Sequence, residues 1–226
     1  MLKMPKIAAV EAVFFDLDGT LADTAPDLGG ALNRVRHEEG LEPVPLHLLR
    51  PVVSQGVRGL LRVGFGLHPD DKGYPALQER VLEHYEQNIC DATVLFPGVD
   101  ELLERLESLQ LPWGIITNKR SRYTEPLVRA MQLDVRAVTV VSGDTAGVPK
   151  PAPEPMLHAC RAAGVNPENC WYVGDDLRDI QAAHAANMRA IAAAWGYLGD
   201  GSPPEEWHAE ALAHSPADIA RIIGLG

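Results

Sequence analysis

The chain has few cysteines and no long apolar run. Its three cysteines among 226 residues, Cys90, Cys160 and Cys170, show no C-x-x-C spacing, so we expect no disulfide framework and a reducing compartment. No apolar run approaches the about 20 residues that a membrane span requires, and the first residues lack the apolar core and cleavage site of a signal peptide. We therefore expect a cytoplasmic protein without membrane contact.

Positive charge is also scarce. The chain has 20 Lys and Arg against 31 Asp and Glu, which gives a formal net charge of −11. Nucleic acids and anionic membranes are bound through basic surfaces, so the charge argues against a nucleic-acid-binding function. The hydrophobic fraction of 46% is ordinary for a globular protein. We expect a folded protein, either a monomer or a homodimer.

Short apolar runs alternate with amphipathic patterns along most of the chain. Amphipathic helices are predicted over 99–110, 153–164 and 179–188. Strands alternating with helices predict an α/β fold with a doubly wound (Rossmann-like) parallel sheet. The runs predicted as buried strands are "AVFF" (12–15), "WGIIT" (113–117), "AVTVVSG" (137–143), "CWYVG" (170–174) and "RAIAAAW" (189–195).

Residues 25–94 break this alternation, because they show helical patterns and no convincing strand. The segment is too long for a simple crossover, so we interpret it as an inserted all-helical cap domain. The core domain is then formed by residues 1–24 and 95–226. Residues 197–214 are predicted as loop with a helical turn, and 216–224 as a last short helix.

Polar side chains follow the ends of four predicted strands. Ligands of open parallel sheets bind outside the carboxyl ends of the strands, so we expect these side chains to form one site. They are Asp16 and Asp18 after the first strand, Thr117 and Asn118 after the second, Lys150 after the third, and Asp175, Asp176 and Asp179 after the fourth.

This set of side chains favours phosphoryl transfer. Crowded carboxylates repel one another unless a cation joins them, and an oxygen-only cluster suits Mg²⁺. A hydroxyl, an amide and a lysine would stabilise the oxygens of a transferring phosphoryl group. The cluster contains no serine or cysteine, so a carboxylate must be the nucleophile. A second acid two residues away can protonate the leaving oxygen and then deprotonate the hydrolytic water.

Four segments of the chain resemble the motifs of the haloacid dehalogenase-like phosphatase superfamily. They are "DLDGT" (16–20), "IITN" (115–118), "PKPAPE" (149–154) and "VGDDLRD" (173–179). The segment from 25 to 95 stands where this superfamily has its helical cap. The resemblance implies a phosphatase that uses Mg²⁺ and an aspartyl-phosphate intermediate.

The same resemblance implies a role for each matching residue. Asp16 would be the nucleophile and a metal ligand, and Asp18 the general acid/base, with its backbone carbonyl on the metal. Thr117 and Asn118 would bind the phosphoryl group, Lys150 would neutralise the phosphoaspartate, and Asp175 would ligate Mg²⁺. Asp176 stands where many relatives have serine, which makes it a weaker metal candidate. Asp179 would orient Lys150 or a metal-bound water.

The substrate is expected to be a small phosphorylated metabolite. The chain is most similar to phosphoglycolate phosphatases, but "RPVVSQGVRGLL" (50–61), "GDDLRDI" (174–180) and "AAWGYLG" (193–199) also resemble N-acetylmuramic acid 6-phosphate phosphatases. A sugar phosphomutase would share every motif. A haloacid dehalogenase would have no use for Asp18, and the complete catalytic set argues against an inactive binding module.

Two polar segments have open interpretations. Ser54, Gln55, Gly56 and Arg58 of the cap either face the substrate or form an ordinary helix start, and we assign Arg58 to substrate binding. Lys119, Arg120 and Arg122 either attract the anionic substrate or form a solvated basic turn.

Overall fold

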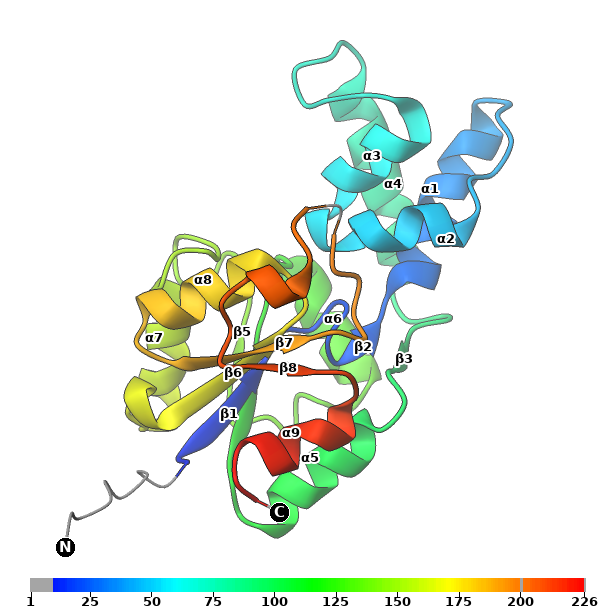
Figure 1. Cartoon of the computed structure of the whole chain (residues 1–226). Helices are drawn as coiled ribbons and strands as arrows, with labels where there is room; N and C mark the ends of the chain where they lie inside the picture. Colours follow the sequence, from blue (N-terminus) through cyan, green and yellow to red (C-terminus); the bar gives the residue numbers. More distant parts are fainter. Residues whose placement is uncertain (1–9, 200, 226) are drawn as a thin grey trace, which may run out of the picture.

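A computed structural model describes residues 10–199 and 201–225 (Figure 1). Its main sheet has six strands in the order β5-β4-β1-β6-β7-β8, and every neighbouring pair is parallel. This confirms the predicted doubly wound α/β fold. The strands are β1 (Ala12–Phe15), β4 (Trp113–Ile116), β5 (Val140–Val141), β6 (Cys170–Gly174), β7 (Arg189–Ala193) and β8 (Ala211–Ala213).

The central strand β1 is buried on both faces. Val13 and Phe15 pack into one apolar cluster, and Ala12 and Phe14 pack into another, as the alternation of side chains along a strand requires. Helices α5 (Val99–Ser108), α6 (Ser121–Ala130) and α9 (Pro216–Ile222) contribute to the first cluster. Helices α7 (Glu154–Ala163) and α8 (Leu177–Ala185) contribute to the second. The two layers hold the carboxyl end of β1 in place.

The structure corrects two expectations about local structure. The prediction of loop over 197–214 is wrong at Ala211–Ala213, which forms the edge strand β8 beside β7. This run has no β-branched residue, so its strand conformation depends on pairing rather than on propensity. Helix α6 was not predicted either, and its internal Pro126 is a residue that argues against a helix in a sequence.

The predicted helical insert is present and consists of four α-helices and a 3₁₀-helix between two short strands. Strands β2 (Ala22–Asp23) and β3 (Val94–Leu95) pair antiparallel, so the chain leaves and re-enters the core side by side. Figure 1 shows the insert beyond the end of the sheet where β1 ends. The helices of the insert are α1 (Ala25–Glu38), α2 (Leu46–Leu49), η1 (Arg50–Gln55), α3 (Val57–Phe65) and α4 (Tyr74–Gln87).

The insert has its own apolar core, which includes Leu32, Leu60, Leu61 and Val81. Near the junction with the sheet, the buried carboxylate of Asp27 accepts hydrogen bonds from the backbone of Ala92 and from the backbone and hydroxyl of Thr93. These bonds fasten the start of α1 to the returning strand. Within residues 10–199 and 201–225, the helices are too short or too polar to cross a membrane.

Candidate active site

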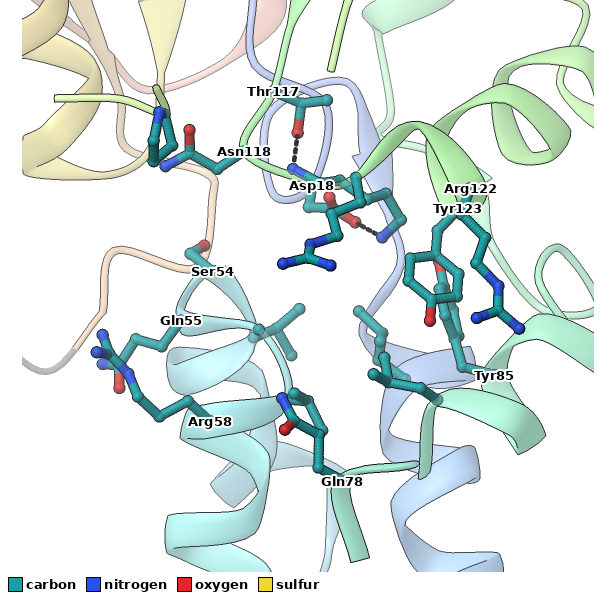
Figure 2. A pocket seen from close by; sticks show the side chains of 18 of the residues that line it. Asp18, Ser54, Gln55, Arg58, Gln78, Tyr85, Thr117, Asn118, Arg122 and Tyr123 are labelled. Atoms are coloured by element: carbon teal, nitrogen blue, oxygen red, sulfur yellow. Dashed lines mark hydrogen bonds and ion pairs between the residues drawn. The ribbon is translucent and has the colours of Figure 1, made fainter. Parts of the chain in front are cut away.

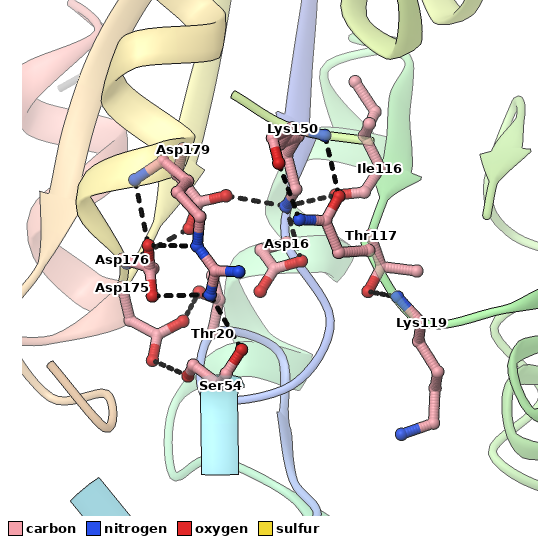
Figure 3. A network of polar contacts seen from close by, with 12 residues as sticks. Asp16, Thr20, Ser54, Ile116, Thr117, Lys119, Lys150, Asp175, Asp176 and Asp179 are labelled. Carbon is pink, nitrogen blue, oxygen red and sulfur yellow. Dashed lines mark hydrogen bonds and ion pairs between the residues drawn. The ribbon is translucent and has the colours of Figure 1, made fainter. Parts of the chain in front are cut away.

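A buried lysine connects three of the strand ends. Lys150 Nζ lies 2.8 Å from Asp16 Oδ1 and 2.6 Å from Asp179 Oδ1 (Figure 3). It also donates to the carbonyl oxygen of Ile116 at 3.0 Å and to Tyr172 Oη at 2.7 Å. Sequence reasoning missed Tyr172, which points inward from β6 and donates in turn to the Ile116 carbonyl. The ammonium is therefore held in one position directly beside the Asp16 carboxylate.

Asp16 and Lys150 influence each other's protonation. Burial raises the pKa of Asp16 above its ordinary value, and the positive charge of Lys150 opposes this shift. Burial acts to lower the pKa of Lys150, but the carboxylates of Asp16 and Asp179 outweigh it and raise that pKa. Lys150 therefore stays charged, and it compensates negative charge at Asp16.

Three buried carboxylates form a group that could hold a metal ion. Asp16, Asp175 and Asp179 each offer one oxygen, and these oxygens lie within 4.8 Å of one another. Burial raises the pKa of Asp175 well above its usual range and that of Asp179 to about 7. A divalent cation would relieve this cost, and an oxygen-only donor set fits Mg²⁺. The group contains the Asp179 side chain, whereas sequence reasoning named the backbone carbonyl of Asp18 as the third ligand.

The position of Asp175 depends on close neighbours. Its carboxylate accepts hydrogen bonds from Thr20 Oγ1 at 3.0 Å and from the backbone nitrogen of Tyr197 at 2.8 Å. A Cβ atom added at Gly19 or at Gly196 would lie 2.2 Å from an atom of the Asp175 side chain. Glycine is therefore required at both positions if the carboxylate is to keep its place.

Asp18 has different partners from Asp16. Its Oδ1 accepts from Thr24 Oγ1 at 2.6 Å and from Lys119 Nζ at 2.8 Å. The side chain of Lys119 is only 8% exposed and lies against the ring of Tyr85. A solvated basic turn is therefore wrong for Lys119. The side chain of Arg122 is 63% exposed and paired with Glu86, but it also lines the cavity described below, so both interpretations stay open for it.

Thr117 and Asn118 follow β4 at the same end of the sheet. Thr117 is buried, and its hydroxyl accepts from the backbone nitrogen of Lys119 at 3.2 Å. The Asn118 amide donates to the carbonyl of Lys150 and accepts from the nitrogen of Lys150, at 3.0 and 2.8 Å. Asn118 thus fixes the backbone that carries Lys150.

Asp176 caps a helix in this structure. It is the N-cap of α8, where its side chain accepts from the backbone of Arg178 and Asp179 reciprocates on the Asp176 nitrogen. Arg178 then holds the Asp176 carboxylate with two nitrogens and donates to the carbonyl of Ser54 at 2.8 Å. Ser54 Oγ reaches Asp175 Oδ2 at 3.2 Å. Sequence reasoning missed Arg178, because its charge alone does not indicate contact with the cap.

A cavity of about 730 Å³ lies between the core and the insert (Figure 2). Asp16, Asp18, Thr117, Asn118 and Lys150 line it from the core, so the structure brings these five together; Asp175 lies beside them and is fully buried. From the insert come Arg58, predicted to bind substrate, together with Ser54, Gln55, Gly56, Gln78 and Tyr85. Gly56 is also the N-cap of α3, so this segment both faces the cavity and starts a helix.

Comparisons with known proteins agree on the family. The model of the haloacid dehalogenase-like hydrolase family matches residues 13–193. A phosphoglycolate phosphatase of Xanthomonas campestris pv. campestris is 43% identical over 209 residues, covering 92% of this chain and 94% of that protein. An N-acetylmuramic acid 6-phosphate phosphatase of Pseudomonas putida is 36% identical over 214 residues, covering 95% and 96%.

Comparison with solved structures points to the same family. The crystal structure of a predicted phosphoglycolate phosphatase from Haemophilus somnus superimposes with a TM-score of 0.82 at 25% identity, and the match covers 94% of this chain and 97% of that one. The chain therefore belongs to the haloacid dehalogenase-like hydrolase family.

Proposed function

We propose that this haloacid dehalogenase-like hydrolase is a Mg²⁺-dependent phosphomonoesterase that acts on a small phosphorylated metabolite, with 2-phosphoglycolate as the leading candidate. The observation that carries the proposal is the buried contact of 2.8 Å between Lys150 Nζ and Asp16 Oδ1, next to the carboxylates of Asp175 and Asp179. It combines a carboxylate nucleophile, a cation that offsets its charge, and ligands for a metal.

In the first half-reaction, an oxygen of Asp16 attacks phosphorus and the bond to the leaving oxygen breaks. Thr117 and Asn118 bind the phosphoryl oxygens, and Lys150 compensates the charge at the aspartyl-phosphate. Asp18 gives its proton to the leaving alkoxide, which departs as an alcohol. Asp16, Asp175 and the backbone carbonyl of Asp18 would hold Mg²⁺, with the Asp179 carboxylate beside them on Lys150, and the ion would neutralise phosphoryl charge.

In the second half-reaction, Asp18 takes a proton from a water molecule as that water attacks the phosphorus. The bond between phosphorus and Asp16 breaks, inorganic phosphate leaves, and both carboxyl groups return to their starting states. Thr24 Oγ1 and Lys119 Nζ, at 2.6 and 2.8 Å, fix the Asp18 side chain for both transfers. Each of the two acids of "DLDGT" thus has a separate task on one phosphorus atom.

A second candidate substrate is N-acetylmuramic acid 6-phosphate. The cavity of about 730 Å³ falls in the range of about 300–1,000 Å³ that drug-sized ligands occupy, which leaves room for an amino sugar. The P. putida relative carries that name at 36% identity. Phosphoglycolate remains first because the relative of that name is 43% identical.

The test is phosphate release from the two esters side by side, with Mg²⁺ present and the Asp16→Asn variant as the blank. A higher kcat/KM for 2-phosphoglycolate supports the leading candidate, and a higher value for the amino-sugar phosphate replaces it with the second. No release from any phosphomonoester above the blank would refute the phosphatase itself.

A further inference from the structure

Two buried polar side chains beside Asp18, Lys119 and Tyr85, have so far been given no contact with the substrate. Lys119 comes from the loop after β4, and Tyr85 comes from α4 of the insert; both line the large cavity. Lys119 and Asp18 are joined across 101 positions of sequence, and Tyr85 joins them only because the insert folds over the core. The wall of the cavity that Asp18, Lys119 and Tyr85 form therefore exists only in the folded protein.

Lys119 brings a positive charge to this wall. Its Nζ donates to Asp18 Oδ1 at 2.8 Å and lies 4.7 Å from the centroid of the Tyr85 ring, a cation–π distance. An ammonium carries three donor hydrogens, and one of them serves Asp18, so donor capacity is left for a ligand. The side chain is more than nine-tenths buried, so water screens its charge only weakly and the charge would attract an anion that enters the cavity.

Tyr85 brings an unpartnered hydroxyl. The residue is 1% exposed, and its Oη has no partner with good hydrogen-bond geometry among residues 10–199 and 201–225, where Lys119 is the charge that acts on it most strongly. Buried tyrosine hydroxyls ordinarily have a partner, so a ligand in the cavity is the natural one. Burial raises the pKa of Tyr85 to about 12, and the hydroxyl therefore stays protonated and able to donate at neutral pH. Tyr85 lies next to Tyr123 at the edge of the cavity (Figure 2).

The location of the pair relates it to the leaving group. In the proposed reaction Asp18 contacts the leaving oxygen, so substituents on the carbon attached to that oxygen lie next to the partners of Asp18. Lys119 is one of those partners, and Tyr85 packs on Lys119. Both side chains are donors there, so they suit a group that only accepts hydrogen bonds and carries negative charge.

We propose that Lys119 and Tyr85 form a subsite for a carboxylate on the leaving group, one carbon away from the ester oxygen. The inference rests on the proposed phosphatase function and deepens it: the enzyme selects phosphate esters of small hydroxy acids over esters of neutral alcohols. The ammonium supplies the charge, and the phenol supplies a second hydrogen bond.

The test is a binding measurement that does not depend on turnover. Calorimetry in Mg²⁺ compares 3-phosphonopropionate, a non-hydrolysable isostere of 2-phosphoglycolate, with 3-methylbutylphosphonate, which has an isopropyl group in place of the carboxylate. The unaltered protein is expected to prefer the carboxylate ligand. In Lys119→Met that preference should fall by about 10- to 100-fold, the effect of losing a hydrogen bond to a charged group, and in Tyr85→Phe by about 3- to 10-fold.

The controls separate the subsite from general damage. Tyr74→Phe changes another buried cap tyrosine that does not line the cavity, and it should leave the preference unchanged. Lys119→Arg keeps the charge and should restore most of the preference lost in Lys119→Met. Tyr85→Phe removes one oxygen only, so it tests the subsite even if Lys119→Met does not fold.

Two results would overturn the subsite. One is equal or undetectable binding of the two phosphonates by the unaltered protein, and the other is an unchanged preference in both Lys119→Met and Tyr85→Phe. Failure of the phosphatase proposal looks different: phosphonate preference would follow the variants as expected, while no phosphate ester released phosphate above the Asp16→Asn blank.

Discussion

The two ends of the large cavity differ in how their charges are arranged. At the core end, Lys150 is surrounded by Asp16, Asp179, Tyr172 and the carbonyl of Ile116, so one network of contacts holds the carboxylate of Asp16. On the opposite side, α3 and α4 present Arg58, Gln78 and Tyr85 to the cavity. Under the proposed function, this difference places bond breaking in the core and selection of the leaving group in the insert.

The two active-site lysines show the same difference on a smaller scale. Both contact a carboxylate of "DLDGT" at 2.8 Å. Lys150 is enclosed by core residues only, while Lys119 lies between Asp18 of the core and Tyr85 of the insert. In the proposed reaction, Lys150 would serve the step common to every substrate, and Lys119 would contact the part in which substrates differ.

The largest effect is expected at the core end, from Asp16→Asn. Turnover of every phosphate ester should be lost, because an amide neither attacks phosphorus nor contributes negative charge to the metal site. Circular dichroism should show an intact fold, since Lys150 keeps its contact with Asp179. Substantial remaining phosphate release would mean that Asp16 is not the nucleophile.

A smaller but still large effect is expected from Asp18→Asn. This variant keeps the nucleophile and loses proton transfer, so kcat should fall by roughly 10²–10⁴-fold. Rapid quenching with labelled substrate should detect trapped phosphoenzyme for esters with good leaving groups. A rate equal to that of the unaltered enzyme would remove Asp18 from the mechanism.

An effect of about tenfold is expected on the cap side, from Arg58→Ala. KM for the preferred ester should rise about tenfold with kcat nearly unchanged, as loss of uniform binding predicts. The matched control is Arg34→Ala, on α1 and away from the cavity lining. An equal loss of kcat on all substrates would contradict the division of labour between the two ends.

The smallest effect is expected from a change of pH, which should shift the unfolding temperature by a few degrees. Burial raises the pKa of Asp175 well above its ordinary value and raises the pKa of Asp179 to about 7. In the unfolded chain the pKa of both carboxyl groups is about 4. A carboxyl with a raised pKa stabilises the fold at low pH, and this contribution is lost as the pH rises through the folded-state pKa. Without metal, stability should therefore decrease between about pH 4 and pH 7.

Mg²⁺ should reverse this loss, because it replaces the protons among the carboxylates. Thermal unfolding followed with and without Mg²⁺ should show a larger increase at pH 8 than at pH 5. Asp175→Asn serves as the control and should remove most of the increase. The same Mg²⁺ effect at both pH values would argue against a metal among these carboxylates.

Much of the fold could be predicted because its signals are local. The runs at 12–15 and 170–174 became β1 and β6 with the predicted bounds, since strands buried on both faces are continuous apolar runs. Edge strand β8 was missed because its conformation comes from its neighbour β7. Helix α6 was missed because it contains Pro126, a residue that ordinarily ends a helix.

The sequence by itself determined which chemical groups gather at the core end. Parallel strands carry their carboxyl ends to one edge of the sheet, so the order of apolar runs and polar residues along the chain was enough to assign these residues to one site. Only the tertiary structure decided what closes that site. Ser54 donates a hydrogen bond to Asp175, which is 121 positions away in the sequence. The ring of Tyr85 contacts Lys119 only because the insert packs on the core. Such contacts depend on how two packed bodies fit together, and no periodicity along the chain encodes that.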